Sequence, residues 1–434
     1  MEPREIAQRI LDGDTSVIPG PSARYRCGWL RHPDALPATV SNLESALDPR
    51  HQRTLLLGMG GSASGAGMLL EANGVTTVEI LDTSHPDVIQ GTDFDDVNVI
   101  ASSKSGGTVE TVCALAYALD HGLEPRDLTI VTDQGTSLHE LGQSLNATVV
   151  VGDRDTGGRF SALSVFGLTP AVIAGVGLRN LEVWPASSDV WCDAFERGFQ
   201  SVRSSHGTPT APLRDDPLTS WAALWEEQLI AESTGKDGRG VIPVAGRRNS
   251  GETIEETHAR VVGMCVALGV DPFDQPDVEQ SKQITFEILA DGNRGVLQET
   301  ESADQCITLT NTDPHTIAIE VFGKPVPELT GALAAARDRM TANGRVALAG
   351  YGPRYLHSTG QMFKGGPSSV SLLQIAVTPQ SAPCRISGRS YSFHDLMDAQ
   401  WRGDRRAMMR LGRTVRSIEC DSTESAVALL SQLG

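Results

Sequence analysis

The chain has 434 residues, of which 40% are hydrophobic and 21% are charged, proportions typical of globular proteins. This length predicts two or three domains, with cores large enough to need neither disulfides nor a structural metal. The formal net charge of −18 argues against nucleic acid or an anionic membrane as a partner, because those surfaces attract a basic face.

The seven cysteines are scattered along the chain and form no CxxC pair. An odd number without close spacing predicts reduced thiols in a cytoplasmic protein, and neither a disulfide framework nor a zinc site. The polar N-terminus does not look like a signal peptide. No apolar run approaches the roughly 18 residues that a membrane span needs.

Residues 1–50 contain several prolines and predict short helices and loops laid over a domain. Beyond them, short aliphatic or β-branched runs alternate with helical stretches, a pattern typical of βα units around a buried parallel sheet. Five such runs occupy residues 54–57, 78–81, 97–101, 128–131 and 148–151. They predict a flavodoxin-like, doubly wound parallel sheet.

A second series of strands is predicted after a largely helical middle region. Its runs occupy residues 241–244, 306–309, 317–321, 345–349 and 372–377, with helices expected at 255–268, 278–289, 328–341 and 396–411. We therefore assign the chain to the α/β class, with two doubly wound domains. The proline- and glycine-rich stretch 204–217 is the predicted boundary. It divides the chain into an N-terminal segment 1–50, a first domain 51–205 and a second domain 206–434 with a C-terminal tail.

The stretch SSKSGGT at residues 102–108 follows the third predicted strand and opens a helix. Unpaired N–H groups and the positive end of the helix dipole meet at such a position. Glycine lets the backbone approach an anion closely, and the serine, threonine and lysine side chains add hydroxyls and a charge. The pattern favours phosphate binding. A serine-rich turn that only caps the helix is the alternative.

The loop GMGGSA at residues 58–63 follows the first predicted strand and fits GxGxxA, with Asp82 near the end of the next strand. That spacing is typical of dinucleotide binding. A turn that packs a helix against a strand is a second interpretation. A sugar-phosphate site is a third, because this loop and residues 103–108 would lie at the same edge of the sheet.

Three further motifs place ionic side chains beside glycines or at a helix start. They are GGRFS at 157–161, ESTGKDG at 232–238 and FDQPDVEQSK at 273–282. Taken singly, Arg159, Glu232 and Lys282 also fit solvated surface residues.

Together the five motifs, in this order, resemble those of the glucose-6-phosphate isomerases, which are built from two sugar-isomerase (SIS) domains. The stretch GYGPRYLHSTGQMFKGGP at residues 350–367 is also similar to the isomerase part of bacterial transaldolase–isomerase fusions. The sequence departs from the family pattern at Asp277, where the family has glycine, and at Arg154 and Thr156.

The resemblance implies catalytic roles for individual residues. Glu232 matches the catalytic base, Arg159 the arginine that stabilises the enediolate, and Lys282 the lysine that assists ring opening. The ring-opening histidine has two candidates, His258 and His357 in the tail.

The resemblance also implies a substrate-binding set. Residues Ser103, Lys104, Ser105 and Thr108 match the phosphate loop. Gly61 and Ser62 match the loop beside the sugar.

The activity implied is the interconversion of glucose 6-phosphate and fructose 6-phosphate through a cis-enediol, without metal or cofactor, as in glycolysis and gluconeogenesis. A base shielded from water suits abstraction of a weakly acidic C–H proton, and a fixed cation suits the developing oxyanion. The unreactive phosphate anchors the substrate. The resemblance further implies a homodimer, in which the family's histidine crosses from the partner subunit. Three alternatives stay open: a non-catalytic sugar-phosphate binding or regulatory protein, an isomerase that takes mannose 6-phosphate, and a dinucleotide-dependent enzyme.

Overall fold

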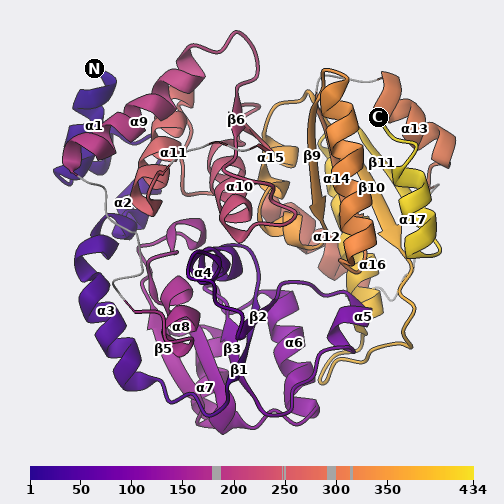
Figure 1. Ribbon diagram of the computed structural model, residues 1–434, viewed down its shortest axis with the longest axis horizontal. Coiled ribbons are helices and arrows are strands. Elements are labelled where there is room, and N and C mark those ends of the chain that lie inside the picture. The colour runs from indigo at the N-terminus through magenta and orange to yellow at the C-terminus, as the bar shows by residue number, and fades with distance from the viewer. Residues whose placement is uncertain (178–186, 247, 249–250, 291–299, 313–315) are drawn as a thin grey trace.

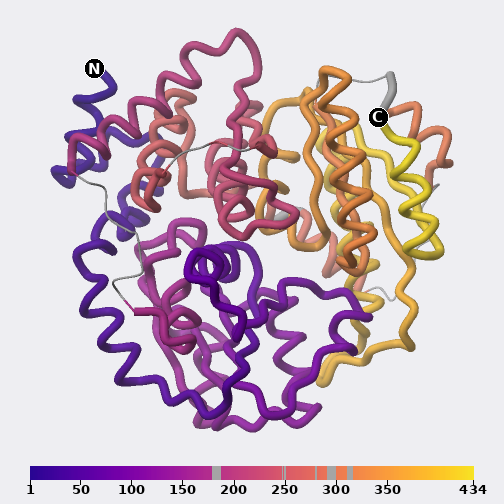
Figure 2. Tube along the Cα trace, viewed as in Figure 1, coloured from indigo at the N-terminus to yellow at the C-terminus, as the bar shows by residue number. Residues whose placement is uncertain are grey.

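The computed structural model describes residues 1–177, 187–246, 248, 251–290, 300–312 and 316–434. Its two parallel sheets occupy opposite parts of the molecule, the first in purple and magenta and the second in orange and yellow (Figure 1). The trace in Figure 2 shows a third, helical region beside the second sheet. Part of the helical middle region predicted above, residues 178–186, lies outside the described residues.

The first sheet has the strand order β2-β1-β3-β4-β5, and all its neighbouring strands are parallel. Its strands are β1 Arg53–Gly58, β2 Val78–Leu81, β3 Val97–Ser102, β4 Leu128–Asp133 and β5 Thr148–Gly152. In the register, Leu56 lies between Ile80 and Ile100. The prediction of a flavodoxin-like doubly wound sheet is confirmed.

Helices cover both faces of the first sheet. On one face lie α3 His32–Ala46, α4 Gly61–Ala72 and α8 Val165–Ile173, packed with Leu56, Ile100 and Val131. On the other lie α5 Pro86–Ile89, α6 Val109–Asp120 and α7 Ser137–Leu145, packed with Leu55 and Leu57. Burial on both sides explains why the inner strands β1 and β3 are largely apolar and do not alternate with exposed polar positions.

The second sheet has the order β11-β10-β8-β9 and is also fully parallel. Its strands are β8 Thr316–Phe322, β9 Val346–Tyr351, β10 Val370–Val377 and β11 Val415–Cys420. If these four strands are numbered 1 to 4 in chain order, their order in the sheet, read from β9, is 2-1-3-4. The first four strands of the first sheet have the same order. The two α/β units therefore share one architecture, as predicted.

Helices also sandwich the second sheet. The helices α13 Ala303–Thr312, α14 Pro327–Ala342 and α17 Thr423–Leu430 pack on one face. On the other lie α15 Gly360–Gly365 and α16 Phe393–Arg410, and α12 Val278–Ala290 packs on α16. The division of the chain at residues 50 and 205 stays a prediction.

Two of the expected strands differ in the structure. Residues 306–309 belong to α13, because Cys306 and Leu309 are spaced three apart and both lie buried on one helical face against β11. Residues Ile242–Val244 form β7, which pairs with β6 Thr210–Pro212 in a separate two-stranded sheet. Conversely, β11 arises from a stretch for which no strand was predicted.

The helical region contains α1 Pro3–Leu11, α2 Ala23–Arg26, α9 Ser188–Arg203 and α11 Ile254–Leu268, with α10 Trp221–Thr234 at the centre of the molecule (Figure 1). The α9 and α11 backbones approach closely at Gly198 and Gly263, where a Cβ would lie 1.9 Å and 2.1 Å from carbonyl oxygens of the other helix. In the described residues, no helix combines the length and apolar character that crossing a membrane requires. All seven cysteines are free.

Candidate active site

A cavity of about 380 Å³ lies between the carboxyl edge of the first sheet and helices of the second unit. Its walls come from the loops after β1 and β3, the loop beyond β5, and helices α10, α12, α15 and α16. The volume is within the range of small-molecule sites. The position agrees with the rule that ligands of doubly wound sheets bind outside the strand carboxyl ends.

The two glycine- and serine-containing loops form one wall of this cavity. Gly60 has φ +53°, a conformation that favours glycine. A Cβ on Gly61 would lie 2.3 Å from the carbonyl oxygen of Gly158, so this position is closely packed against the GGRFS loop. Ser62, Ser105 and Thr108 line the cavity. Ser103 does not; it is buried beneath the loop, where its hydroxyl lies 2.8 Å from that of Thr108.

Lys104 lies in the same wall, but its ammonium is engaged with neighbouring groups. The Nζ atom donates to both carboxylate oxygens of Asp133, at 2.8 and 2.9 Å, and to the carbonyl of Asp153. Burial lowers the pKa of Lys104, and the hydrogen bond and charge of Asp133 only partly offset that effect. The three donors of the ammonium are therefore occupied within the protein.

Arg159 and Glu232 form a buried ion pair at the cavity, with 2.8 Å between Arg159 Nη1 and Glu232 Oε1. Both residues are 5% exposed. The remaining guanidinium nitrogens are fixed by the Ser233 hydroxyl and by the carbonyls of Pro272 and Asp274. A carboxylate shielded from water and a rigid positive group thus lie side by side, as acid–base chemistry with charge stabilisation requires.

Gln228 lies one helical turn before Glu232 on α10 and connects several parts of the site. Its Nε2 donates to Glu232 Oε2 at 2.9 Å and to the backbone carbonyl of His357 at 2.8 Å. Its Oε1 accepts a hydrogen bond from Ser64 at 2.9 Å. This network fixes the second oxygen of Glu232 and links the carboxylate to the tail.

His357, in the 3-10 helix η6 Arg354–His357, lines the cavity and pairs with Glu110 of α6. The distance from His357 Nε2 to Glu110 Oε1 is 2.8 Å, and Gln400 donates to the same oxygen at 2.5 Å. Burial raises the pKa of Glu110, but the charge of His357 and the hydrogen bonds outweigh that effect, so the net pKa is lowered. This carboxylate orients a histidine that faces the same cavity as Glu232.

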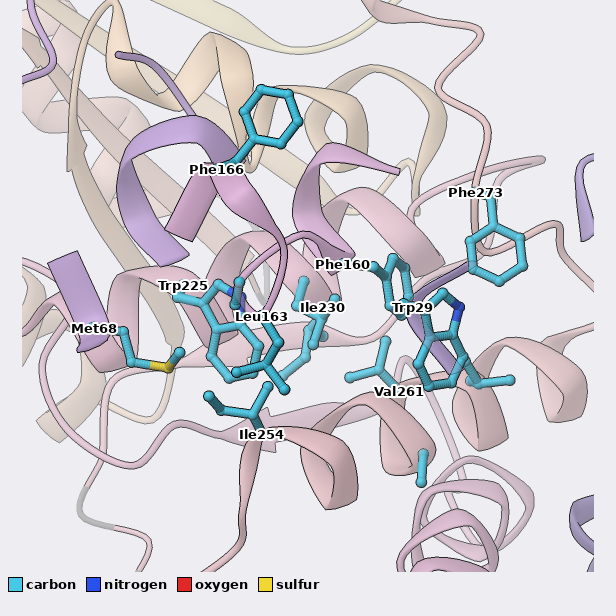
Figure 3. Close-up of a cluster of buried hydrophobic side chains, with 14 of the residues drawn as sticks. Trp29, Met68, Phe160, Leu163, Phe166, Trp225, Ile230, Ile254, Val261 and Phe273 are labelled. Atoms are coloured by element: carbon cyan, nitrogen blue, oxygen red, sulfur yellow. The ribbon is translucent and has the colours of Figure 1, made fainter. Parts of the chain in front are cut away.

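His258, the other candidate histidine, is fully buried and does not line the cavity. Its ring packs against Trp29, Phe160 and Trp225 with centroid distances of 5.2, 5.0 and 5.6 Å. Those three side chains belong to the hydrophobic cluster shown in Figure 3. Its Nδ1 lies 3.3 Å from Glu255 Oε1. The structure therefore places His258 in the core.

Lys282 of α12 and Lys364 of α15 both line the cavity. Lys364 is buried and pairs with Asp404 at 2.6 Å. Asp277, the departure from the family pattern, accepts a hydrogen bond from Gln361 of α15 at 2.7 Å and donates from its backbone N–H to Gln361 Oε1 at 3.1 Å. The acidic residue thus holds the tail helix against the start of α12.

Asp82, expected under the dinucleotide interpretation to meet a ribose, is engaged elsewhere. Its two oxygens lie 2.5 and 2.9 Å from the guanidinium of Arg354. Asp82 is 6% exposed and does not line the cavity. This arrangement leaves the dinucleotide interpretation without its ribose-binding carboxylate.

The cavity thus brings together eight residues singled out in the sequence: Gly61, Ser62, Ser105, Thr108, Arg159, Glu232, Lys282 and His357. Lys104 joins them with its charge already paired. Sequence reasoning missed Arg26, Glu110, Gln228, Lys364 and Gln400 as cavity residues. The i, i+4 spacing of Gln228 and Glu232 on one helix was a usable signal, whereas the others depend on contacts between distant segments.

The fold and the cavity define a class: a doubly wound α/β protein in which a serine- and glycine-rich loop at a helix start and a buried carboxylate–guanidinium pair line one cavity. No family model matches the chain. Curated proteins do: the probable glucose-6-phosphate isomerase of Haloquadratum walsbyi is 26% identical over 342 residues, which are 72% of this chain and 77% of that protein. The glucose-6-phosphate isomerase of Streptococcus thermophilus is 31% identical over 274 residues, 54% of this chain and 60% of that protein.

A third relative, the glucose-6-phosphate isomerase of Parabacteroides distasonis, is 26% identical over 261 residues, which cover 50% of this chain and 58% of that protein. The chain thus matches less than two thirds of the length of two of these three relatives. It is a relative of the glucose-6-phosphate isomerases. A solved isomerase from Chlamydia trachomatis aligns with 95% of this chain and 69% of its own, at 13% identity and a TM-score of 0.29. That alignment adds no support to the fold, which rests on strand order and register.

Proposed function

We propose that the chain is an aldose–ketose isomerase of phosphosugars that interconverts glucose 6-phosphate and fructose 6-phosphate. The observation that carries the proposal is the buried Arg159–Glu232 pair, 2.8 Å apart, in the cavity that the Ser105–Thr108 loop also lines. Curated relatives named for this activity support it.

The phosphate is bound by the loop that leads into α6. The first backbone N–H groups of this helix lack partners within it, and its dipole favours an anion. Ser105 and Thr108 offer hydroxyls at the same place. Because the phosphoryl group does not react, its binding energy positions C1 and C2 of the sugar.

Glu232 removes the proton from C2 of the open-chain aldose and returns it to C1, while the O2 hydroxyl proton passes to O1, so that the aldehyde becomes the ketose. Negative charge develops on oxygen in the steps to and from the cis-enediol intermediate, and the Arg159 guanidinium beside Glu232 stabilises that charge. The bonds that hold Arg159 in place mean that little reorganisation is needed during the reaction.

Ring opening requires a proton donor and acceptor at the ring oxygen and O1. We propose His357 for this step, because it lines the cavity and Glu110 holds its ring, whereas His258 is enclosed in the core. Lys282 lines the same cavity and supplies a positive charge. The homodimer implied by the resemblance and the cytoplasmic location predicted from the cysteines stay predictions; sedimentation of the purified chain tests the first.

The test is isomerisation in deuterium oxide, followed by NMR. The wild-type chain should convert glucose 6-phosphate to fructose 6-phosphate and introduce deuterium at C2 of the aldose. Glu232→Gln should reduce both signals at least about 100-fold, the usual minimum effect of removing a general base. Glu44→Gln, on the exposed face of α3, is the matched control.

Binding of glucitol 6-phosphate, which cannot isomerise, should persist in Glu232→Gln. A wild-type chain that binds this compound but neither isomerises nor exchanges protons would be a sugar-phosphate sensor, and the proposal would be wrong. Turnover of mannose 6-phosphate alongside glucose 6-phosphate would extend the substrate range without changing the chemistry.

A further inference from the structure

The basic side chains of the cavity differ in the groups that they meet. In the described part of the chain, four of them lie within ion-pair distance of a carboxylate. The pairs are Lys104–Asp133, Arg159–Glu232, His357–Glu110 and Lys364–Asp404. A phosphate dianion entering the cavity must compete with these carboxylates for the same cations.

Lys104 illustrates the competition most clearly, because it lies within the phosphate loop. Its three ammonium donors are directed to the two oxygens of Asp133 and to the Asp153 carbonyl. Lys104 and Asp133 are both largely buried, with side chains 13% and 16% exposed. Turning Lys104 toward a phosphate would leave Asp133 as a poorly solvated, unpaired carboxylate, which is unfavourable.

Arg26 offers an unneutralised charge at the same part of the cavity. It ends α2, the short helix of the N-terminal segment that lies above α3 in Figure 1. Its side chain lines the cavity with Lys104, Ser105 and Thr108. Burial is the larger cause of the lowered pKa of Lys104, and the positive charge of Arg26 adds to it.

The guanidinium of Arg26 retains most of its hydrogen-bonding capacity. It donates from Nη1 to the carbonyl of Arg154 at 2.7 Å, and it meets no carboxylate among the described residues. The other N–H donors of the planar guanidinium make no hydrogen bond within the described part of the chain, and their arrangement matches the oxygens of a phosphate group. The hydrogen bond from the Gly28 N–H to the Asp155 carbonyl, 2.8 Å, fixes the backbone just beyond α2 to the loop that precedes Arg159.

We propose that Arg26 is the cation that binds the phosphoryl group of the substrate, and that Lys104 instead holds the loop in shape through Asp133. The assignment rests on the proposed function for the identity of the substrate. Under this assignment the N-terminal segment is part of the substrate site, and Arg26 favours phosphorylated sugars over free sugars. Because Arg26 contacts the unreactive end of the substrate, it acts on binding and not on proton transfer.

The experiment compares Arg26→Gln with Arg24→Gln, an exposed arginine two residues earlier on α2 that does not line the cavity. Calorimetry with the full chain measures the affinity for inorganic phosphate and for glucitol 6-phosphate, and steady-state assays give KM and kcat. Arg26→Gln should weaken both ligands about 10- to 100-fold, the effect of one or two lost charge-assisted hydrogen bonds. KM should rise with little change in kcat, and Arg26→Lys should recover part of the affinity.

A second variant tests the role given to Lys104. Adding Asp133→Asn to Arg26→Gln should restore part of the phosphate affinity, because the Lys104 ammonium is then released from its carboxylate. Wild-type affinity in Arg26→Gln, or an equal loss in Arg24→Gln, would overturn the assignment while leaving the isomerase proposal intact. A chain that binds phosphate through Arg26 but does not isomerise glucose 6-phosphate would support the assignment and overturn the proposed function.

Discussion

His357 Nε2 lies 2.8 Å from Glu110 Oε1, although 247 positions separate the two residues in the sequence. Gln400 donates to the same Glu110 oxygen, and Ser84 donates to Gln400. This chain of hydrogen bonds connects α6, the helix that follows the loop at residues 103–108, to η6 and α16 of the second unit. The C-terminal tail, which carries His357 and Gln400, therefore completes the cavity.

Replacing His357 with glutamine should impair ring opening more than proton transfer. Erythrose 4-phosphate provides the comparison, because its phosphorylated terminal oxygen cannot close a ring. We expect His357→Gln to lose roughly 100-fold in kcat/KM with glucose 6-phosphate, a typical effect of losing acid–base assistance, and much less with the four-carbon aldose. Coupled assays of both substrates measure the ratio.

Glu110→Gln should shift the same ratio in the same direction by a smaller factor, because it leaves the imidazole present but poorly oriented. His258→Gln provides the contrast: removing a ring enclosed by Trp29, Phe160 and Trp225 should lower Tm and leave the substrate ratio unchanged. A change of ratio in His258→Gln with none in His357→Gln would reverse the two roles.

The site should also function without a partner subunit. Glu232, Arg159 and His357, the residues proposed for proton transfer, charge stabilisation and ring opening, belong to one chain and line one cavity. We expect the specific activity to stay constant as the protein is diluted through the range in which sedimentation shows dissociation of any dimer. Loss of activity in step with dissociation would indicate a residue contributed across an interface.

The sequence predicted those parts of this arrangement that depend on local patterns. The five strands of the first sheet follow from their apolar runs, and Arg159, Glu232 and the loop at residues 103–108 were identified from their motifs before the structure placed them along one cavity. An apolar run alone did not distinguish a helix from a strand at residues 306–309. Strand β11 alternates buried and partly exposed positions at the edge of its sheet, so it lacks the continuous apolar run that marks the inner strands.

The pairings of the site were not predictable in this way. The choice between His258 and His357 depends on tertiary contacts: both lie in polar sequence surroundings, yet one ring is enclosed by aromatic side chains and the other faces a cavity. The ion pair of Lys104 with Asp133 also depends on tertiary structure, because it joins the loop after β3 to the end of the neighbouring strand β4. The spacing of residues within a motif predicts neither feature, because it does not show which distant side chains surround a histidine or a lysine.

Gly61 should tolerate no side chain. A Cβ at this position would lie 2.3 Å from the Gly158 carbonyl oxygen and 2.8 Å from the Arg159 backbone nitrogen, both backbone atoms that cannot move independently. Gly61→Ala should therefore displace the loop that carries Arg159, lowering kcat at least tenfold and also lowering Tm. Gly331→Ala, where nothing lies within 4 Å of the added Cβ in α14, should instead stabilise the protein by about 0.5–1 kcal/mol. Equal behaviour of the two variants in activity and melting assays would contradict this account.

Glu227 precedes Gln228 on α10 and is buried, and it lines with Glu320 a cavity of about 10 Å³, enough for about one water molecule. Burial raises the pKa of Glu227 to about 8; the charges of Arg337 and Arg354 oppose this rise, and that of Asp216 adds to it. Burial and the charges of Glu227 and Asp404 also raise the pKa of Glu320, against the effect of Arg354. As the pH rises, Glu227 in the folded protein therefore keeps its proton up to about pH 8, whereas an unfolded glutamate loses its proton near pH 4.5.

Between pH 4.5 and about 8, Glu227 binds more protons in the folded state than in the unfolded state, so its contribution to the free energy of unfolding falls as the pH rises. Glu227→Gln removes this contribution and keeps the shape of the side chain. We expect the variant to match the wild type near pH 5 and to become progressively more stable than it toward pH 8, by a few kcal/mol. Urea denaturation at several pH values measures the difference, with Glu44→Gln as the exposed control. Parallel stability curves for Glu227→Gln and the wild type would mean that Glu227 is already ionised in the folded protein.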